Sequence, residues 1–333
     1  MNGRMRIVVT GSSGHLGEAL VRSLGSAGHD VFGVDVLPSA FTALVGSVTD
    51  RDVAHAAVTD ADAVIHAATL HKPHLATHSF EAFVETNVAG TAVLLEAAIG
   101  AGVRAFVLTS STSTFGHALT PPEGLPAAWI TEDVVPVPKN IYGVTKVAAE
   151  DLCRVAHLER RLGCVVLRLA RFFPEDDDDD ALRARYGPDN LKVNELLFRR
   201  VDLADAVSAC ELAVRRAGTV GVGPYVISAT TPFVPAHLGE LRKDAPAVVR
   251  RLYPDFEAVY ARMGWQMIRS IDRVYVNTRA REALGWEPAH DFGWALGRLR
   301  SGEDTRSRLA AEVGAKGYHG EPTGVYSRGR PAP

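Results

Sequence analysis

The 333-residue sequence has few cysteines and no long apolar run. Its three cysteines, Cys153, Cys164 and Cys210, are scattered and include no Cys-x-x-Cys pair, which argues against a disulfide framework and against a zinc site. Residues 1–6 lead directly into a predicted strand and leave no room for a signal peptide. No run approaches the ~18 apolar residues of a membrane span. We therefore expect a cytoplasmic protein without membrane attachment.

A surplus of charge of one sign is also missing. The chain has 36 Lys and Arg residues against 39 Asp and Glu residues, a net charge of −3. This balance gives no electrostatic reason to bind nucleic acid. The acidic run at 175–180 is typical of a solvated loop, and the histidines at 66, 71, 74 and 78 have no spacing that places three on one face. We expect no nucleic-acid partner and no metal.

What the sequence does contain is a glycine-rich loop near its start. Residues 10–17 follow an apolar run at 6–9 and precede a helical pattern, which is the context of a dinucleotide-binding loop. Gly11 permits a tight turn, Gly14 lets the backbone approach a pyrophosphate, and Gly17 allows close packing of helix on strand. The plainer alternative is a turn without a ligand.

Asp35 ends the second predicted strand, about 20 residues beyond the glycines, where a carboxylate can accept hydrogen bonds from an adenosine ribose. Val36 and Leu37 follow it in place of an arginine. A 2′-phosphate would be repelled there, so NAD is favoured over NADP. The alternative is an aspartate that only caps a turn.

A second constellation lies in the middle of the chain. Tyr142 and Lys146 are four residues apart in a helical pattern, so both face one side. Because the ordinary pKa of tyrosine is about 10, a nearby cation is needed for the phenol to act as a base near neutrality. Residues 109–114 form a hydroxyl cluster after an apolar strand, and such a cluster can hydrogen-bond a substrate carbonyl.

With these elements the chain resembles an extended short-chain dehydrogenase/reductase of the NAD-dependent epimerase/dehydratase family, UDP-glucose 4-epimerases included. The resemblance extends over nearly the whole sequence. Further shared motifs are at 66–68, 87–91, 167–168, 278–280 and 284–288.

The resemblance implies a role for each matching residue. Ser111 becomes the hydroxyl catalyst, Tyr142 the acid/base, and Lys146 the residue that binds the nicotinamide ribose and lowers the pKa of the tyrosine. The implied cofactor contacts are Gly11, Ser13, Gly14, His15, Leu16, Gly17, Asp35, Ser47, Val48, Ala67, Ala68, Asn87, Thr109, Tyr142 and Lys146. The expected substrate contacts are His71, Ser111, Thr112, Ser113, Tyr142, Arg171, Asn194 and Arg199.

Several positions depart from the family pattern. Thr112 and Ser113 stand where dehydratases carry an acidic pair, so a dehydratase reaction lacks its acid and base. Arg171 replaces a substrate-binding asparagine, and its guanidinium suits a carboxylate or a phosphate. The arginines at 199–200 are displaced from the usual diphosphate-binding position. Ser47 replaces an aspartate, which weakens the predicted adenine contact.

The pattern of elements predicts an α/β fold. Strands near 6–10, 31–36, 63–67, 104–110 and 164–169 alternate with helices, which is typical of a doubly wound parallel sheet of the Rossmann type. We expect an NAD-binding domain over 1–170, a smaller substrate lobe over 171–300 with some segments returning to the first domain, and a loosely packed tail over 301–333. Dimerisation is implied by the resemblance, through helices near 80–100 and 143–161.

The expected function is NAD-dependent oxidation of a secondary alcohol in a sugar or nucleotide sugar. If the ketone takes the hydride back on its other face, the enzyme is an epimerase, which the resemblance favours. If the ketone leaves, it is a dehydrogenase of the uronate type, which Arg171 favours. A non-catalytic NAD-sensing regulator is the third alternative, and the presence of both Tyr142 and Lys146 argues against it.

Overall fold

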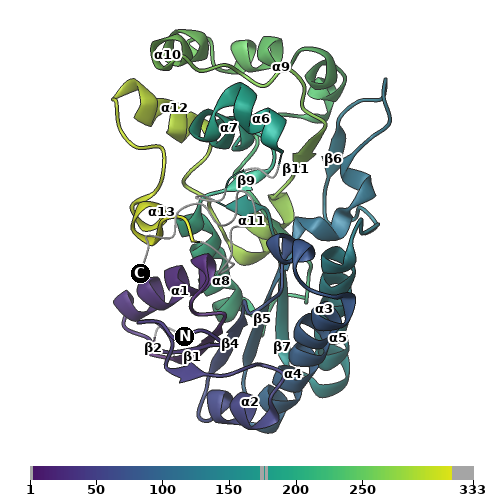
Figure 1. The fold of residues 1–333 in the computed structure, drawn as a ribbon, viewed down its shortest axis with the longest axis vertical. Helices are drawn as coiled ribbons and strands as arrows, with labels where there is room; N and C mark the ends of the chain where they lie inside the picture. The colour runs from purple at the N-terminus through teal and green to yellow at the C-terminus, as the bar shows by residue number, and fades with distance from the viewer. Residues whose placement is uncertain (1–2, 173–175, 177–178, 317–333) are drawn as a thin grey trace.

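The centre of the fold is a seven-stranded parallel sheet, seen in the computed structural model, which describes residues 3–172, 176 and 179–316 (Figure 1). Each pair of neighbouring strands runs parallel, for example with Ile7 opposite both Val31 and Ala63. The strands lie in the order β10 (Tyr225–Ile227), β7 (Gly163–Leu169), β5 (Ala105–Ser111), β4 (Ala63–His66), β1 (Arg6–Thr10), β2 (Asp30–Asp35) and β3 (Leu44–Val45). The predicted doubly wound α/β fold is confirmed.

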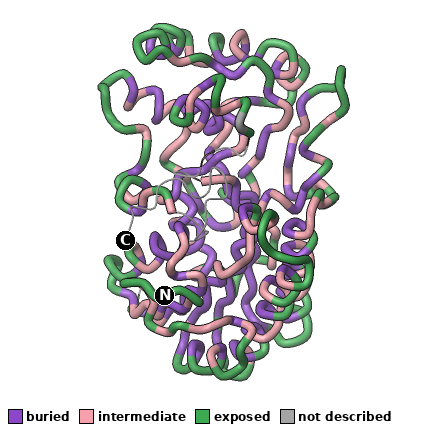
Figure 2. Tube along the Cα trace, viewed as in Figure 1, coloured by how far each residue is buried: buried purple, intermediate pink, exposed green. Residues whose placement is uncertain are grey.

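Helices cover both faces of this sheet because its strands are apolar on both sides. In β1, Ile7 and Val9 belong to one core and Val8 to the other, as the two-residue repeat of a strand requires. Buried residues accordingly follow the strands in Figure 2. The first core includes helices α1 (His15–Ser26) and α8 (Leu203–Arg216), and the second includes α2 (Arg51–Val58), α4 (Gly90–Gly100) and α5 (Ile141–Arg160).

One helical stretch differs from the sequence-based expectation. Phe80–Gly100 consists of α3 (Phe80–Val84), a π-helical turn (Glu85–Ala89) and α4, and by length and composition it could cross a membrane. In the most apolar 18-residue window of this stretch, 44% is buried inside the protein. Helix α4 packs against α2 and α5. The core helix of a soluble protein passes the same test, so this is weak evidence for a membrane.

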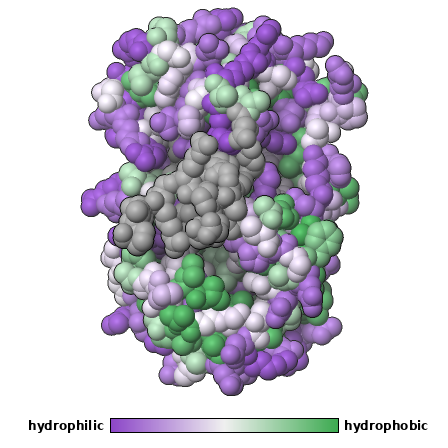
Figure 3. Space-filling model, in the orientation of Figure 1, coloured by the Kyte–Doolittle hydropathy of each residue, from purple (hydrophilic) through white to green (hydrophobic). Residues whose placement is uncertain are grey.

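The second lobe lies over the carboxyl ends of the strands (Figure 1). Two small parallel sheets support it, β8 (Arg171–Phe172) with β9 (Arg200–Val201) and β6 (Ala128–Ile130) with β11 (Arg273–Tyr275). Its helices are α6 (Asp180–Tyr186), α7 (Pro188–Glu195), α9 (Leu238–Leu252), α10 (Phe256–Met263) and α12 (Phe292–Arg300). Hydrophilic residues predominate on its outer surface in the view of Figure 3.

Shorter elements complete the described chain. Residues 301–316, expected to pack loosely, include helix α13 (Arg308–Val313), in which Ala310 and Val313 are buried. Half of the acidic run at 175–180 (residues 175, 177 and 178), and all of 317–333, lie outside the described residues. The remaining elements are α11 (Thr278–Leu284) and the 3-10 turns Lys72–Ala76, Thr112–Phe115, His117–Leu119 and Pro235–His237.

Candidate cofactor and active site

The glycine loop, the hydroxyl cluster and Tyr142 line a single cavity of about 1040 Å³ at the carboxyl ends of the strands. Ligands of open parallel sheets bind at this edge, and the volume is slightly above the usual range of roughly 300–1,000 Å³ for ligand sites. The predicted residues that line it are Gly11, Ser13, Gly14, His15, Leu16, Gly17, Asp35, Ser47, Val48, Ala67, Ala68, His71, Thr109, Ser111, Thr112, Ser113, Tyr142, Arg171 and Arg199.

The glycine loop is packed too closely for side chains at two of its positions. A methyl group on Gly17 would lie 1.9 Å from the Gly11 carbonyl oxygen, and one on Gly11 would lie 2.7 Å from the backbone nitrogen of Ala68. Gly11 also has a φ of 73°, which disfavours other residues. Gly14 is the N-cap residue of α1, and no side chain caps this helix start. The resulting cradle of backbone groups at a helix N-terminus fits the pyrophosphate of a dinucleotide.

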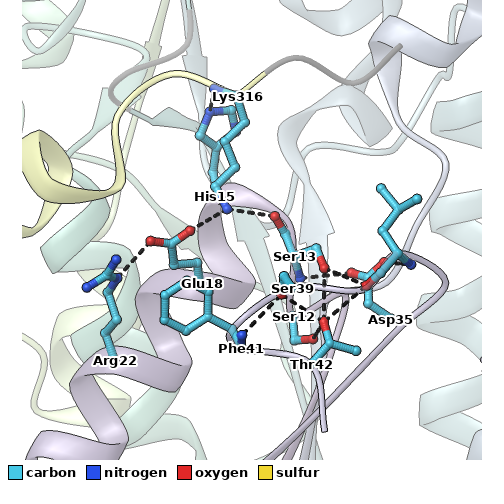
Figure 4. Close-up of polar contacts among 11 residues, drawn as sticks. Ser12, Ser13, His15, Glu18, Arg22, Asp35, Ser39, Phe41, Thr42 and Lys316 are labelled. Atoms are coloured by element: carbon cyan, nitrogen blue, oxygen red, sulfur yellow. Dashed lines mark hydrogen bonds and ion pairs between the residues drawn. The ribbon is translucent and has the colours of Figure 1, made fainter. Parts of the chain in front are cut away.

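Asp35 is held at the end of β2 by backbone groups (Figure 4). One carboxylate oxygen accepts a hydrogen bond from the Ser13 N–H at 2.9 Å, and the other accepts one from the Leu37 N–H at 2.9 Å. Asp35 thus makes the turn contacts of the plainer alternative and still lines the cavity. Since an ionised carboxylate accepts about four hydrogen bonds, it retains acceptor capacity for a ribose.

An apolar rim that the sequence did not indicate lies beside Asp35. Val36 and Leu37 line the cavity although they are 63% and 54% exposed. Apolar side chains at the mouth of a pocket suit the face of a planar base. From the sequence, Val36 and Leu37 indicated only that no arginine follows Asp35. Single exposed apolar residues are common on protein surfaces, so they do not by themselves indicate a binding site.

Ser111 and Tyr142 lie on the same wall of the cavity because the start of α5 packs closely against the segment that follows β5. Ser111 ends β5, and its Oγ accepts a hydrogen bond from the Ser113 N–H at 3.1 Å. Tyr142 lies in the first turn of α5, which Asn140 caps by accepting the Gly143 N–H at 3.0 Å. A methyl group on Gly143 would lie 2.8 Å from the Ser113 carbonyl oxygen. Glycine at this position therefore lets the start of α5 approach the hydroxyl cluster.

Lys146 lies one helical turn beyond Tyr142 and is buried. Burial lowers the pKa of Lys146 to about 8, although the neighbouring Glu150 carboxylate opposes the shift. The ammonium form thus predominates at neutral pH, where it stabilises a negative charge on a nearby oxygen. Lys146 is not among the described residues that line the cavity.

Two asparagines that were predicted as ligand contacts hydrogen-bond neighbouring segments of the chain. Asn87 is buried, where its amide accepts the Leu70 N–H and donates to the Leu70 carbonyl, both at 2.8 Å. Asn194 is buried in α7, where it donates to the Gln266 carbonyl and accepts from the Tyr260 hydroxyl, both at 2.9 Å. Neither lines the cavity. Their hydrogen bonds to neighbouring segments use the amide groups that were expected to bind ligands.

The second lobe contributes arginines to the cavity wall. Arg199 and Arg171 lie 2.5 and 4.0 Å from the same oxygen of Glu195, whose other oxygen pairs with Arg200 at 2.6 Å. Glu195 and Arg200 are fully buried. Burial lowers the pKa of Arg200, which Glu195 counteracts. The carboxylate thereby fixes guanidinium groups at the wall.

Among the described residues that line the cavity, cationic side chains outnumber carboxylates. The carboxylate among them belongs to Asp35. His71 and His74 also line it, with ring centroids 4.9 Å apart and the rings tilted by 57°. No group of three metal-binding side chains occurs in the described part of the chain. The cations are Lys72, Lys139, Arg171, Arg199, Arg273 and Lys316, of which the sequence predicted only Arg171 and Arg199.

Comparisons with known proteins agree with this geometry. Residues 7–187 match the model of the NAD dependent epimerase/dehydratase family. The UDP-glucose 4-epimerase of Streptomyces lividans is 30% identical over 171 residues, 48% of this chain and 50% of that enzyme. The 3-diazoavenalumate denitrifying reductase of a Streptomyces species is 30% identical over 86% of this chain and 97% of that enzyme. The chain spans half or less of the length of several curated relatives, the Streptomyces lividans enzyme among them.

Solved structures extend the likeness to both lobes. A short-chain dehydrogenase/reductase superfamily protein from Agrobacterium tumefaciens, crystallised with bound NAD, is 26% identical. It superposes with a TM-score of 0.64, covering 92% of this chain and 99% of that one.

Proposed function

Since the chain belongs to the NAD dependent epimerase/dehydratase family and is an enzyme that uses NAD, we propose that it oxidises a secondary alcohol of an anionic sugar or nucleotide sugar. One observation carries this proposal. Ser111 and Tyr142 share a cavity with the glycine loop, and Lys146 is buried one helical turn beyond Tyr142. This combination brings a proton acceptor, a hydrogen-bond donor and a dinucleotide cradle to one place.

Each residue has a definite task in this proposal. The Tyr142 phenolate removes the hydroxyl proton of the substrate, and the Lys146 ammonium stabilises that phenolate. The Ser111 hydroxyl donates a hydrogen bond to the oxygen as it becomes a carbonyl. When bound, NAD supplies the acceptor for the hydride that leaves the carbon. Tyr142 returns the proton if the carbonyl is reduced again.

Epimerisation is the favoured outcome. The family includes epimerases, and the relative from Streptomyces lividans is a UDP-glucose 4-epimerase. If the ketone instead leaves the enzyme, the reaction is a dehydrogenation. Arg171 favours this second candidate, because a guanidinium at the cavity wall suits a free carboxylate such as that of a uronate.

Replacement of Arg171 by asparagine tests the anionic substrate. We expect Arg171→Asn to lower kcat/KM for a uronate or sugar phosphate by about 10- to 100-fold, as the loss of hydrogen bonds to a charged group does. The neutral counterpart of the same sugar should be turned over as by the wild type. Coupled assays of epimer and NADH formation measure both, and Arg262→Asn, an exposed site on α10, is the control. An equal loss for charged and neutral sugars would contradict an anion-binding role.

We also propose a homodimer formed through α3 and α5. These helices expose large apolar residues: Phe80, Val84, Val144, Val155 and Leu158. Pairing of such faces removes apolar surface from water. Light scattering is expected to give the mass of a dimer, and the mass of a monomer at micromolar concentration would contradict the proposal. The three cysteines are free and buried, which agrees with a cytoplasmic location.

A further inference from the structure

The last described residues of the chain lie on the glycine loop at its beginning. Helix α13 packs against α1 and α8, and the N–H of Ser307, which precedes it, donates to the buried Asp202 carboxylate at 3.0 Å. Gly314 ends the helix with a φ of 65°. The chain then reaches the cavity, which Ala315 and Lys316 line.

Lys316 contacts Ser13 in the glycine loop and two residues in the first turn of α1, His15 and Glu18 (Figure 4). Its backbone N–H donates to Nε2 of His15 at 2.7 Å. Its ammonium donates to the Ser13 carbonyl oxygen at 2.7 Å and pairs with Glu18 at 2.5 Å. A single residue thus holds the loop by its main chain and by its side chain.

Two of the partners of Lys316, His15 and Glu18, are buried. Glu18 is buried and bridges Lys316 and Arg22, whose Nε is 2.7 Å from its second oxygen. Burial and the nearby Lys316 lower the pKa of His15 to about 3. The His15 ring is therefore neutral near physiological pH, and its Nε2 remains a hydrogen-bond acceptor for the Lys316 N–H.

The opposite side of the loop is fastened independently. The Ser13 N–H donates to Asp35, the Ser13 hydroxyl donates to the Leu37 carbonyl at 2.9 Å, and the same hydroxyl lies 3.0 Å from that of Thr42. Ser13 is consequently held between the strand that carries Asp35 and the segment that carries Lys316. On the side of that segment, the Lys316 ammonium donates to the Ser13 carbonyl oxygen.

We propose that Lys316 is a positioning residue for the cofactor, which fastens the segment after α13 to the glycine loop and slows the exchange of NAD. The inference rests on NAD as the cofactor and not on the proposed substrate or reaction. It assigns to a residue 301 positions from His15 a function in the dinucleotide site. Slow exchange keeps the cofactor in place over a complete cycle, which an epimerase requires and a dehydrogenase does not.

The test measures release of NADH from the full chain without substrate. Bound NADH is displaced by excess NAD+, and its fluorescence is followed in a stopped-flow instrument. Lys316→Met is expected to accelerate dissociation by about tenfold or more, because charge-assisted hydrogen bonds are lost. Lys243→Met, on the exposed surface of α9, should leave the rate unchanged. Lys316→Arg, which keeps the positive charge, should release NADH almost as slowly as the wild type.

A double-mutant cycle separates the specific contact from a general loosening. Glu18→Gln alone should accelerate release, and its combination with Lys316→Met should add little, since both remove the same pair. Additive effects, or a dissociation rate for Lys316→Met within about twofold of the wild type, would overturn the proposal. Because turnover is not measured, failure of the proposed reaction would leave this result intact.

Discussion

Replacement of Tyr142 by phenylalanine is expected to lower turnover by about 10²- to 10⁴-fold, the usual contribution of a general acid or base. The hydroxyl is the only group removed, and it is the proton acceptor in the proposed reaction. The ring remains to fill its place in the cavity wall. Affinity for NADH should therefore stay close to that of the wild type, as titration of NADH fluorescence measures.

A matched variant controls for the loss of a tyrosine hydroxyl. Tyr253 follows α9 in the second lobe and is not among the residues that line the cavity. Tyr253→Phe should retain wild-type turnover. Near-normal turnover in Tyr142→Phe would remove the phenol from the mechanism, whatever the substrate.

The second large effect concerns stability, at a buried ion pair behind the active site. Glu150 on α5 accepts hydrogen bonds from Arg168 on β7 at 2.7 and 3.0 Å and from the Ser110 hydroxyl at 2.5 Å. Arg168 also stacks on the Phe115 ring, 4.8 Å from its centre. Glu150→Gln leaves the buried guanidinium without a counter-charge, which costs about 3–5 kcal/mol of unfolding free energy. Chemical denaturation monitored by fluorescence measures this loss.

Removal of both charges distinguishes an ion pair from simple packing. The double variant Glu150→Leu with Arg168→Met should be less destabilised than the sum of the two single variants, because neither charge is left alone. Glu257→Gln, which breaks an exposed pair with Arg250, should leave stability almost unchanged. Strict additivity at Glu150 and Arg168 would show that their charges do not interact.

The fold and the cofactor could be predicted because their signals are local in the sequence. The strand at 6–9, the glycines up to Gly17 and the acidic Asp35 lie within one short stretch, and backbone geometry dictates their order. Family, fold class, enzyme class and NAD are confirmed. The catalytic roles of Ser111, Tyr142 and Lys146 stay predictions, although two of these side chains line the cavity together.

The rest of the site depends on contacts between distant segments. Arg273 reaches the cavity only because β11 pairs with β6, whose partner residues are more than 100 positions away. Lys316 arrives from the other end of the chain. Asn194, predicted as a substrate contact, lies buried in α7 and does not line the cavity. A polar side chain in a helix gives no indication of whether it faces a ligand or the interior. No periodicity in a single sequence reports such placements.

In the proposed reaction, this cavity moves a hydride between NAD and an anionic secondary alcohol. The most direct measurement mixes NAD-loaded enzyme, in excess, with uronates and sugar phosphates and follows the near-ultraviolet absorbance of reduced nicotinamide in a single turnover. We predict a rise with at least one anionic sugar, which decays if the hydride is returned and persists if the ketone leaves. No rise with any of them, in a protein that binds NADH, would contradict the account.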